Sequence, residues 1–371
     1  MAKSSGTVLL TGVTGFVGGA IAFELLVNTN SDLVCLVRPR ANSSADERLI
    51  ESLHAAADMY GTTLTDAQLA RCRAVSGDMT MPICGVEPGE LTGITECWHV
   101  AASLAFEDER AEEIALHNVQ GTRNVVDLAG KAGCTVFNHV STAYVAGSQR
   151  GAILETVVPE STVPNNQYER TKVAAESIVR EAGFTTKRIF RPSIVIGHSE
   201  TFKATTFTGL YGFAKVLHRT RDAAHIFIHD QLKVRPLRVR ADGRTPLNTI
   251  PVDYVARVAV NIAAKSNASD IYHLTNDSPL GFSEWCDGIA NVLGIRRPVL
   301  VKNREGFHPV DQEVDDQMAF YQPYISDEKY FDTSNVTAIL GDGVLTCPLD
   351  ADDVAHYVGW YIGRREATSR K

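Results

Sequence analysis

The sequence predicts an α/β protein built on a Rossmann-type, doubly wound parallel sheet, with a smaller C-terminal lobe interleaved along the chain. Three observations support this fold class. Short β-rich segments alternate with helical stretches through the first half of the chain, as in a parallel sheet that is covered on both faces. A glycine-rich turn follows the first of these segments. Near residue 200 the alternation stops, and it resumes after residue 250 for one helix and one strand.

Seven runs have the β-branched and apolar character of buried strands. They are Val8–Thr11, Leu33–Val37, Arg73–Ser76, Glu96–Val100, Thr135–Val140, Lys187–Phe190 and Asp270–Thr275. Seven longer stretches have helical spacing, namely Gly15–Val27, Ala45–Tyr60, Ala111–Ala132, Tyr168–Ala182, Pro251–Ala264, Ser283–Leu293 and Asp350–Arg364. Residues 201–228 give no clear element, Leu232–Val239 reads as a basic strand, and an irregular acidic segment separates the last two helices.

This pattern predicts two parts for the 371-residue chain, which is longer than most single domains. We expect the sheet domain to comprise residues 1–198 plus about 249–277, and the second lobe to comprise residues 199–248 plus 278–371. No internal repeat or low-complexity linker separates them, so the two parts should be interleaved in sequence.

Composition excludes several classes of function. A formal net charge of −8 argues against a nucleic-acid or anionic-membrane binder, because both need a basic surface. The seven cysteines are scattered and include no C-x-x-C pair, which favours buried thiols in a reducing, cytoplasmic location and predicts no metal site. Residues 7–27 are apolar enough to suggest a signal peptide or membrane span. However, Glu24 and four glycines favour a strand, a turn and a buried helix.

The turn after the first strand has the character of a phosphate-binding loop. Gly12, Gly15 and Gly18 stand in a G-x-x-G-x-x-G spacing between a strand and a helix. Glycine permits the tight turn, close approach of the backbone to a pyrophosphate, and close packing of helix on strand. The pyrophosphate then lies on unpaired N–H groups at the helix N-terminus. The sequence therefore predicts a dinucleotide-binding domain, with a glycine-rich packing turn as the alternative.

The end of the second strand indicates which dinucleotide is bound. A carboxylate there would accept hydrogen bonds from the adenosine ribose and favour NAD. The strand instead runs into Arg38 and Arg40. Two guanidinium groups suit the additional 2′-phosphate of NADP through charge-assisted hydrogen bonds, unless they are simply solvated at a strand end. We therefore predict NADPH as the cofactor of the 1–198 domain.

The run YERTK places Tyr168 and Lys172 four residues apart, on one face of a helix. A lysine ammonium beside a tyrosine favours the phenolate and should lower its pKa toward neutrality. Tyr211 and Lys215 have the same spacing, but Tyr211 lies past the sheet pattern and reads as a core or pocket-wall aromatic. Only Tyr168 follows an apolar strand that ends in Ser141 and Thr142, where ligands of open α/β sheets bind.

Together these residues resemble the extended short-chain dehydrogenase/reductases and, within them, the thioester-reductase and fatty-acyl-reductase branch, which is also called male sterility. The matching strings run in order over most of the chain: TGVTGFVGG, LVRPR, ADERLIESL, VSGDMTMP, CWHVAASLAF, NVQGTRNVV, HVSTAYVAG, NNQYERTKVAAE, RPSIVIGHSET and NTIPVDYVARVA. The inserted segment 41–75, the HVSTAYV string and IPVDYVA are the pieces most specific to this branch. The last 90 residues match no known motif.

The resemblance implies a role for each matching residue. Tyr168 would donate a proton, Lys172 would bind the nicotinamide ribose and lower the tyrosine pKa, and Thr142 would hydrogen-bond the substrate oxygen, with Ser141 as a substitute. Asn118 would anchor a relay water. The cofactor would contact the turn residues Gly12, Thr14, Gly15, Phe16, Val17 and Gly18, then Arg38, Arg40, Asp78, Met79, Ala101, Ala102, Ser103, Asn118, Tyr168, Lys172, Pro192, Ser193 and Ile194.

The resemblance also implies a reaction, the NADPH-dependent reduction of an acyl thioester, held on a carrier protein or coenzyme A, to an aldehyde or alcohol. Lys233–Arg240 could meet a phosphopantetheine or an acidic carrier, or be a solvated strand. Two other interpretations keep the fold. One is a sugar-nucleotide epimerase or dehydratase or a steroid-type dehydrogenase, against which the two arginines count. The other is a non-catalytic dinucleotide sensor, which would not need Thr142, Tyr168 and Lys172 together.

Overall fold

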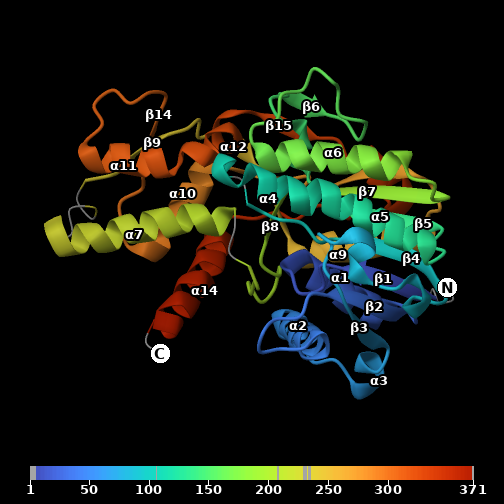
Figure 1. The fold of residues 1–371 in the computed structure, drawn as a ribbon. Helices are drawn as coiled ribbons and strands as arrows, with labels where there is room; N and C mark the ends of the chain where they lie inside the picture. Colours follow the sequence, from blue (N-terminus) through green and yellow to red (C-terminus); the bar gives the residue numbers. More distant parts are fainter. Residues whose placement is uncertain (1–5, 106, 207–208, 229–231, 233–234, 370–371) are drawn as a thin grey trace.

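A computed structural model describes residues 6–105, 107–206, 209–228, 232 and 235–369. Its centre is a seven-stranded sheet in which every neighbouring pair of strands is parallel (Figure 1). The strand order is β12-β7-β5-β4-β1-β2-β3. The strands are β1 (Thr7–Thr11), β2 (Asp32–Val37), β3 (Cys72–Ser76), β4 (Ile94–His99), β5 (Val136–Val140), β7 (Thr186–Pro192) and β12 (Asp270–Leu274). This confirms the predicted fold class and all seven predicted strands.

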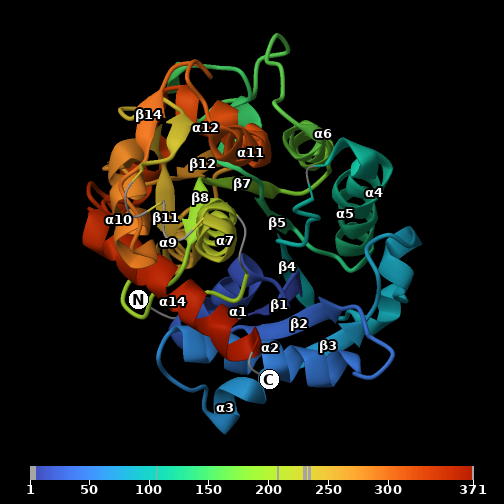
Figure 2. The same cartoon turned by 90° about the vertical axis from the view of Figure 1, so that its left-hand side faces the viewer.

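Helices cover both faces of this sheet, as the alternating pattern predicted. Figure 2 shows α4, α5 and α6 together on one face, whereas α1 and α9 pack against each other on the opposite face. The bounds are α1 (Phe16–Asn28), α2 (Ala45–Met59), α3 (Asp66–Leu69), α4 (Ala111–Ala115), α5 (Gly121–Lys131), α6 (Gln167–Glu181) and α9 (Val252–Lys265). The result is a three-layer α/β/α arrangement.

The apolar run near the N-terminus is accounted for by burial in this core. In β1 the residues from Val8 to Thr11 are all buried, because a central parallel strand packs on both faces. In α1 every residue from Gly18 to Leu26 is buried, including Glu24, whose pKa is raised by burial. Among the described residues, no helix is both long and apolar enough to cross a membrane.

The connections between strands create a crevice beside β1. From β1 the chain moves through α1 to β2 and β3 on one side, and then crosses to β4 on the other side. At such a switch point the loops that follow the two strands diverge and leave an opening at their carboxyl ends. The glycine turn follows β1 here, and Val100 and Ala101 follow β4.

The second lobe has a hydrophobic core of its own. Residues between Ile196 and Leu247 and between Leu280 and Ile362 form it, with Trp285 and Tyr357 fully buried at its centre. Figure 1 shows α7, α10, α11 and α14 grouped beside the sheet. The bounds are α7 (Leu210–Ile228), α10 (Phe282–Leu293), α11 (Pro309–Gln317), α12 (Gln322–Ser326) and α14 (Ala351–Ser369), with short strands β9 (Arg238–Arg240), β10 (Pro246–Leu247), β13 (Leu280–Gly281) and β14 (Val299–Val301).

Two short parallel strand pairs join the lobe to the sheet domain. Strand β8 (Ile194–Ile196) pairs with β11 (Thr249–Pro251), where the chain leaves and re-enters the sheet domain. Strand β6 (Gly151–Ile153) pairs with β15 (Lys329–Phe331). After β15, α13 (Ser334–Leu340) packs back on α9 and β12, so this helix belongs with the core of the sheet rather than with the lobe.

Several predicted elements need correction. The single helix expected at Ala111–Ala132 is α4 and α5 joined by a π-helical turn, η4 (Leu116–Gln120). The stretch 201–228 contains α7, whose start among Thr and Gly residues hides the helical spacing. The basic strand predicted at Leu232–Val239 is limited to β9, with residues 233–234 outside the described part. The segment predicted as irregular holds α11, α12 and α13.

Candidate active site

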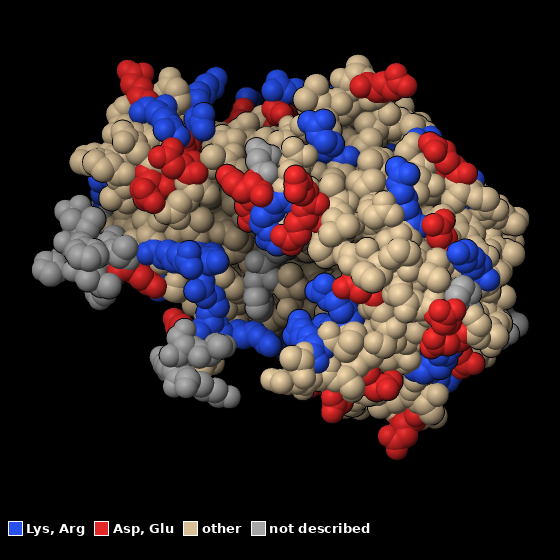
Figure 3. All heavy atoms as spheres, in the orientation of Figure 1, with Lys and Arg blue, Asp and Glu red and all other residues tan. Residues whose placement is uncertain are grey.

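A cavity of about 600 Å³ opens at the carboxyl ends of β1, β4 and β5, between the sheet and the lobe. Figure 3 shows the surface hollowed between these two parts, with Lys and Arg side chains along the edge. Both parts line it. The lining residues are Thr11, Gly12, Thr14, Gly15, Phe16, Val17, Gly18, Leu36, Arg38, Arg48, Gly77, Asp78, Met79, Val100, Ala101, Ala102, Ser103, Leu104, His117, Val140, Ser141, Thr142, Tyr144, Tyr168, Lys172, Pro192, Ser193, Ile194, Val195, Thr206, Gly209, Phe320, Tyr321 and Tyr324.

The glycine turn forms one end of this cavity, and its shape requires glycine. Gly12 has a φ of +81°, and a Cβ there would lie 2.6 Å from the backbone N of Ala101. A Cβ on Gly18 would lie 2.0 Å from the carbonyl O of Gly12. Gly15 precedes α1 and provides no side-chain cap, so the first N–H groups of α1 remain available to a ligand. The turn fits a pyrophosphate.

Arginines near β2 face the same end of the cavity, but they are not the predicted pair. Arg38 lines the cavity, whereas Arg40 does not. The backbone of Arg40 pairs with that of Ser43 in a tight turn between β2 and α2. The second lining guanidinium belongs to Arg48, in the first part of α2, and it donates to the backbone O of Arg38. Burial and the charges of Arg40 and Arg38 lower the pKa of Arg48. An anionic group at this point would relieve the repulsion among the three cations.

Asp78 and Met79 line the cavity together with these arginines, and the cofactor contacts that the resemblance implied for them stay predictions. Burial alone would raise the pKa of Asp78, but hydrogen bonds from Thr80 N and Oγ1, both 2.9 Å, and the charge of Arg38 lower it below its usual range. The Arg38 Nη1 lies 3.4 Å from Asp78 Oδ2. Because Arg38 is mostly exposed, this ion pair holds the guanidinium only weakly and leaves it able to turn to a ligand.

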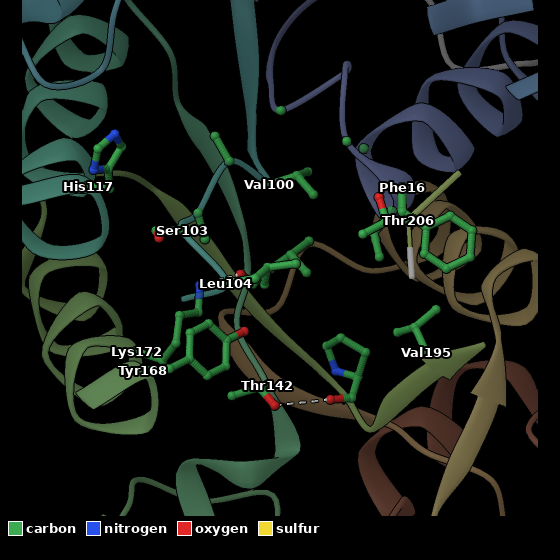
Figure 4. Close-up of a pocket in the computed structure, with 18 of the residues that line it drawn as sticks. Phe16, Val100, Ser103, Leu104, His117, Thr142, Tyr168, Lys172, Val195 and Thr206 are labelled. Carbon is green, nitrogen blue, oxygen red and sulfur yellow. Dashed lines mark hydrogen bonds between the residues drawn. The ribbon is translucent and has the colours of Figure 1, made fainter. Parts of the chain in front are cut away.

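Thr142, Tyr168 and Lys172 come together on one side of the cavity (Figure 4). Thr142 lies two residues past β5 and caps the 3-10 turn η5 (Ala143–Ala146), where its Oγ1 accepts from Tyr144 N at 3.2 Å. The same hydroxyl lies 3.5 Å from the carbonyl O of Pro192. Tyr168 and Lys172 are one turn apart on α6, which begins at an Asn166 cap. The side chains named from the sequence therefore share one cavity.

The ionisation of these groups differs in part from the expectation. Burial, together with the charge of Glu169, raises the pKa of Tyr168 above its ordinary value, so the prediction of a lowered tyrosine pKa is wrong for this structure. Tyr168 therefore holds its proton at neutral pH and is suited to donate it. Burial lowers the pKa of Lys172 to about 8. Lys172 is 2% exposed, and its Nζ donates to the carbonyl O of Val140 at 2.7 Å.

A buried histidine pair lies behind Lys172. The Nε2 of His139 is 3.4 Å from Lys172 Nζ, and the rings of His139 and His99 are 5.2 Å apart. Burial and the Lys172 charge lower the pKa of His139 well below its ordinary value, so the ring is neutral and its Nε2 can accept from the ammonium. His99 is held by Thr11 and Thr122 hydroxyls at 2.8 and 3.0 Å.

Asn118 lies behind the cavity rather than in it. Its Oδ1 accepts from Ser103 N at 2.7 Å, and its Nδ2 is 3.1 Å from both Ser103 O and Thr171 Oγ1. The π-helical turn η4 aims the side chain at both segments, a use often seen for such turns near functional sites. Asn118 thus fixes the Ser103 loop against helix α6, and the relay water implied by the resemblance stays a prediction.

The structure also adds lining residues that sequence reasoning did not find. The side chains of Phe320, Tyr321 and Tyr324 come from the lobe, whose sequence matched no known motif. Within the described residues, no hydrogen-bond partner reaches Oγ of Ser141 or Ser193, and both residues line the cavity. Polar atoms that are buried and unpaired in a cavity are available to a ligand.

Two other sequence candidates lie outside the cavity. Tyr211 is 1% exposed in the lobe core and accepts from Gly197 N at 3.1 Å, as expected for a core aromatic. In the basic run, Arg235 pairs with buried Asp311 and Arg240 with buried Asp315 at 3.3 Å, and Arg238 donates to Glu305 O. Because these arginines are paired within the lobe, the contacts count against the hypothesis that Lys233–Arg240 meets a phosphopantetheine or an acidic carrier protein.

Comparison with known proteins identifies the family of this chain. The family model described as male sterility protein matches residues 10–259. The chain belongs to this family. The matched family model is one of a nicotinamide-dinucleotide-binding domain, and the similar proteins include a linear gramicidin synthase, fatty acyl-CoA reductases and the terminal R domain of a biosynthetic pathway.

Among the relatives, a linear gramicidin synthase chain of Brevibacillus parabrevis is 27% identical over 296 residues, which cover 76% of this chain and 5% of the relative. Fatty acyl-CoA reductase 1 of Xenopus laevis is 30% identical over 226 residues, covering 51% and 43%. The chain thus spans less than half the length of these relatives. The terminal R domain from the myxalamid biosynthetic pathway has a TM-score of 0.76 at 25% identity, with 99% and 92% of the two chains covered.

Proposed function

We propose that the chain is an NADPH-dependent reductase of acyl thioesters, which are presented by coenzyme A or by a carrier protein. The observation that carries this proposal is one shared cavity. In it, the glycine turn after β1 lies at one end, while Thr142, Tyr168 and Lys172 lie on one side. A carbonyl carbon held between these two groups has a dinucleotide site next to it and a proton donor at its oxygen.

The residues present fit NADPH. The turn from Gly12 to Gly18 would hold the pyrophosphate, and Arg38 with Arg48 would hold the 2′-phosphate. Lys172 would bind the nicotinamide ribose, and the unpaired hydroxyl of Ser193 is available beside Pro192 and Ile194. When bound, NADPH supplies the hydride.

The protein supplies the proton and stabilises charge on the carbonyl oxygen. Thr142 Oγ1 and the Tyr168 phenol donate hydrogen bonds to this oxygen as it becomes negative, and Tyr168 transfers its proton to it. The product of these two transfers is a neutral hemithioacetal. Its carbon–sulfur bond then breaks, and its hydroxyl proton passes to the departing sulfur, so that an aldehyde and a free thiol are formed. The balance is one acyl thioester, one hydride and one proton giving an aldehyde and a thiol. A second reduction of the aldehyde would give the alcohol.

Lys172 acts on Tyr168 through charge. Its ammonium donates to Val140 O at 2.7 Å and lies 3.4 Å from His139 Nε2, and these two contacts hold it beside the cavity. A cation one helical turn from a phenol stabilises the phenolate that remains after proton transfer. The high pKa of the resting phenol keeps the proton in place until charge develops on the substrate.

A thioester is favoured over a sugar or free acid for two reasons. The relatives include an enzyme named for fatty acyl-CoA and an R domain at the terminus of a synthetase pathway. In addition, a thioester carbonyl accepts hydride without prior activation by ATP, whereas a carboxylate does not. The paired arginines at the cofactor end count against the NAD-dependent sugar-nucleotide enzymes that share the fold.

The proposal is tested by incubating the protein and NADPH with a panel of acyl-coenzyme A and acyl-carrier thioesters. Free thiol and NADPH are followed in the same sample. We expect thiol release in step with NADPH loss, at one NADPH for each thiol if the aldehyde is the product and two if the alcohol is. If no thiol appears while a ketone or nucleotide sugar is turned over, the protein is a dehydrogenase of another class.

A further inference from the structure

One short segment of the lobe lines the cavity, and the side chains it presents there are aromatic. This segment, residues 319–326, comprises the 3-10 turn η6 (Ala319–Tyr321) and α12. Phe320, Tyr321 and Tyr324 all line the cavity. The Tyr324 ring packs edge-on against Tyr144, 4.8 Å between centroids, and Phe320 lies 5.6 Å from Tyr324. We refer to residues 319–326 as the aromatic segment.

The hydroxyl of Tyr324 is turned away from the cavity and is fully engaged. It donates to Glu169 Oε1 at 2.6 Å and accepts from Asn166 Nδ2 at 2.9 Å. Neither partner lines the cavity, and Glu169 is completely buried. The other carboxylate oxygen of Glu169 accepts from Asn165 N at 2.7 Å. The cavity therefore meets the ring of Tyr324 and not its polar end.

The other side of the aromatic segment packs closely against a glycine of α7, Gly212. A Cβ on Gly212 would lie 1.9 Å from the hydroxyl O of Tyr321, so the ring occupies space that only glycine leaves free. The aromatic segment is thus fixed between α7 of the lobe and the start of α6, where Asn166, Glu169 and the catalytic Tyr168 lie. Its place relative to Tyr168 is set by these contacts at both ends.

We propose that the aromatic segment selects the acyl group, and that the ring of Tyr324 limits how long an apolar acyl chain can be while its carbonyl still reaches Thr142 and Tyr168. This inference rests on the proposed function and names its substrate class, an apolar acyl chain of limited length. Aromatic carbon faces bury methylene groups favourably and offer no hydrogen bond to a polar acyl group. Each methylene accommodated contributes roughly fourfold to binding, so a wall at a fixed position produces a sharp chain-length limit.

The experiment compares wild type with Tyr324→Ala and Tyr324→Phe on short, medium and long saturated acyl-coenzyme A substrates. In Tyr324→Ala the wall is removed, and the ratio of kcat/KM for long over short chains should rise by roughly tenfold or more, as two methylenes gain a site. Tyr324→Phe keeps the ring, and its chain-length profile should match wild type. Tyr330→Ala, an exposed tyrosine of β15, is the matched control and should also keep the profile.

If Tyr324→Ala lowers kcat/KM by the same factor for every chain length, so that its profile runs parallel to that of wild type, the inference is overturned. Binding of NADPH and the thermal midpoint are measured for each variant. If Tyr324→Ala fails to bind NADPH, Tyr324→Leu replaces it, since leucine keeps apolar packing but removes the outer part of the ring. The same chain series is also tested as free aldehydes. If thioesters are inert but aldehydes are reduced, the proposed function fails while the aldehyde profile still tests the aromatic segment.

Discussion

Replacing Lys172 by methionine should abolish activity and yet relieve the folded protein of a buried charge. The residue is 2% exposed, and burial lowers the pKa of its ammonium from 10.5 to about 8. At neutral pH, where the group is charged in both the folded and the unfolded chain, this difference costs roughly 3 kcal/mol of stability. Methionine removes that cost, but it leaves the carbonyl O of Val140 without its donor, which costs about 1–3 kcal/mol.

The dependence on pH separates these two effects. Between pH 8 and pH 10.5 the folded wild type loses the Lys172 proton while the unfolded chain keeps it, so the wild type gains stability relative to Lys172→Met as pH rises. The orphaned carbonyl contributes equally at every pH. The difference in free energy of unfolding between the two proteins should therefore change by roughly 3 kcal/mol in favour of wild type across this range.

Urea unfolding of both proteins at several pH values between 7 and 10.5 measures this difference. The two histidines whose pKa the Lys172 charge lowers, His99 and His139, are neutral in the folded wild type over this range. Lys131→Met, at an exposed position of α5, shows what the loss of a surface lysine does over the same range. A difference that stays constant with pH, or one that moves in favour of Lys172→Met as pH rises, would refute the account of Lys172 as a desolvated cation.

Three further predictions concern the cofactor site and the core. Replacing Arg38 and Arg48 together by alanine should weaken NADPH binding by roughly a hundredfold or more while NADH binding changes little, since each charge-assisted contact contributes about 1.5–3 kcal/mol. The control Arg40→Ala should have a small effect on NADPH binding. Equal affinity of the wild type for NADPH and NADH in a titration would contradict the assignment of the two arginines to the 2′-phosphate. Gly18→Ala should abolish NADPH binding, because the added Cβ would meet the carbonyl O of Gly12. The control Gly130→Ala, where a Cβ meets nothing within 4 Å, should bind NADPH like wild type. Normal NADPH binding by Gly18→Ala would show that the turn can shift. Glu176→Gln should lower the free energy of unfolding in urea by about 3–5 kcal/mol, because it leaves the buried Arg191 guanidinium without the carboxylate 2.7 Å away. The control Glu113→Gln, in an exposed ion pair, should unfold like wild type. Similar unfolding midpoints for the two variants would be inconsistent with a stabilising buried ion pair.

The sheet and the phosphate turn could be predicted from the sequence because both depend on local patterns. A strand buried on both faces is a short apolar run, and the turn after β1 needs glycine at positions that the backbone itself dictates, as Gly12 and Gly18 show. Thr142 could be found because ligands of open α/β sheets bind at the carboxyl ends of the strands, and Tyr168 because its four-residue spacing to Lys172 places both on one helix face. These features use information from only a few adjacent residues.

The remaining parts of the site depend on contacts between distant segments. Arg48 lines the cavity and Arg40 does not, and the spacing of the arginines does not reveal this, because Arg48 belongs to α2, the helix that follows the strand-end turn. Tyr324 is held at the cavity by contacts with distant residues, among them a hydrogen bond to Glu169, 155 residues earlier in the chain. The raised pKa of Tyr168 depends on burial and could not be read from its spacing to Lys172.

The most direct test of the central claim measures thiol release coupled to NADPH oxidation in Tyr168→Phe beside Tyr211→Phe. Both variants lose one hydroxyl from a tyrosine that precedes a lysine by four residues, but only Tyr168 lines the cavity. We expect Tyr168→Phe to bind NADPH as wild type does and to release thiol at least a hundredfold more slowly, roughly the usual effect of removing a general acid. Tyr211→Phe should keep most of the activity. Near-normal thiol release by Tyr168→Phe, with Tyr211→Phe inactive, would contradict the assignment of this cavity and its proton donor.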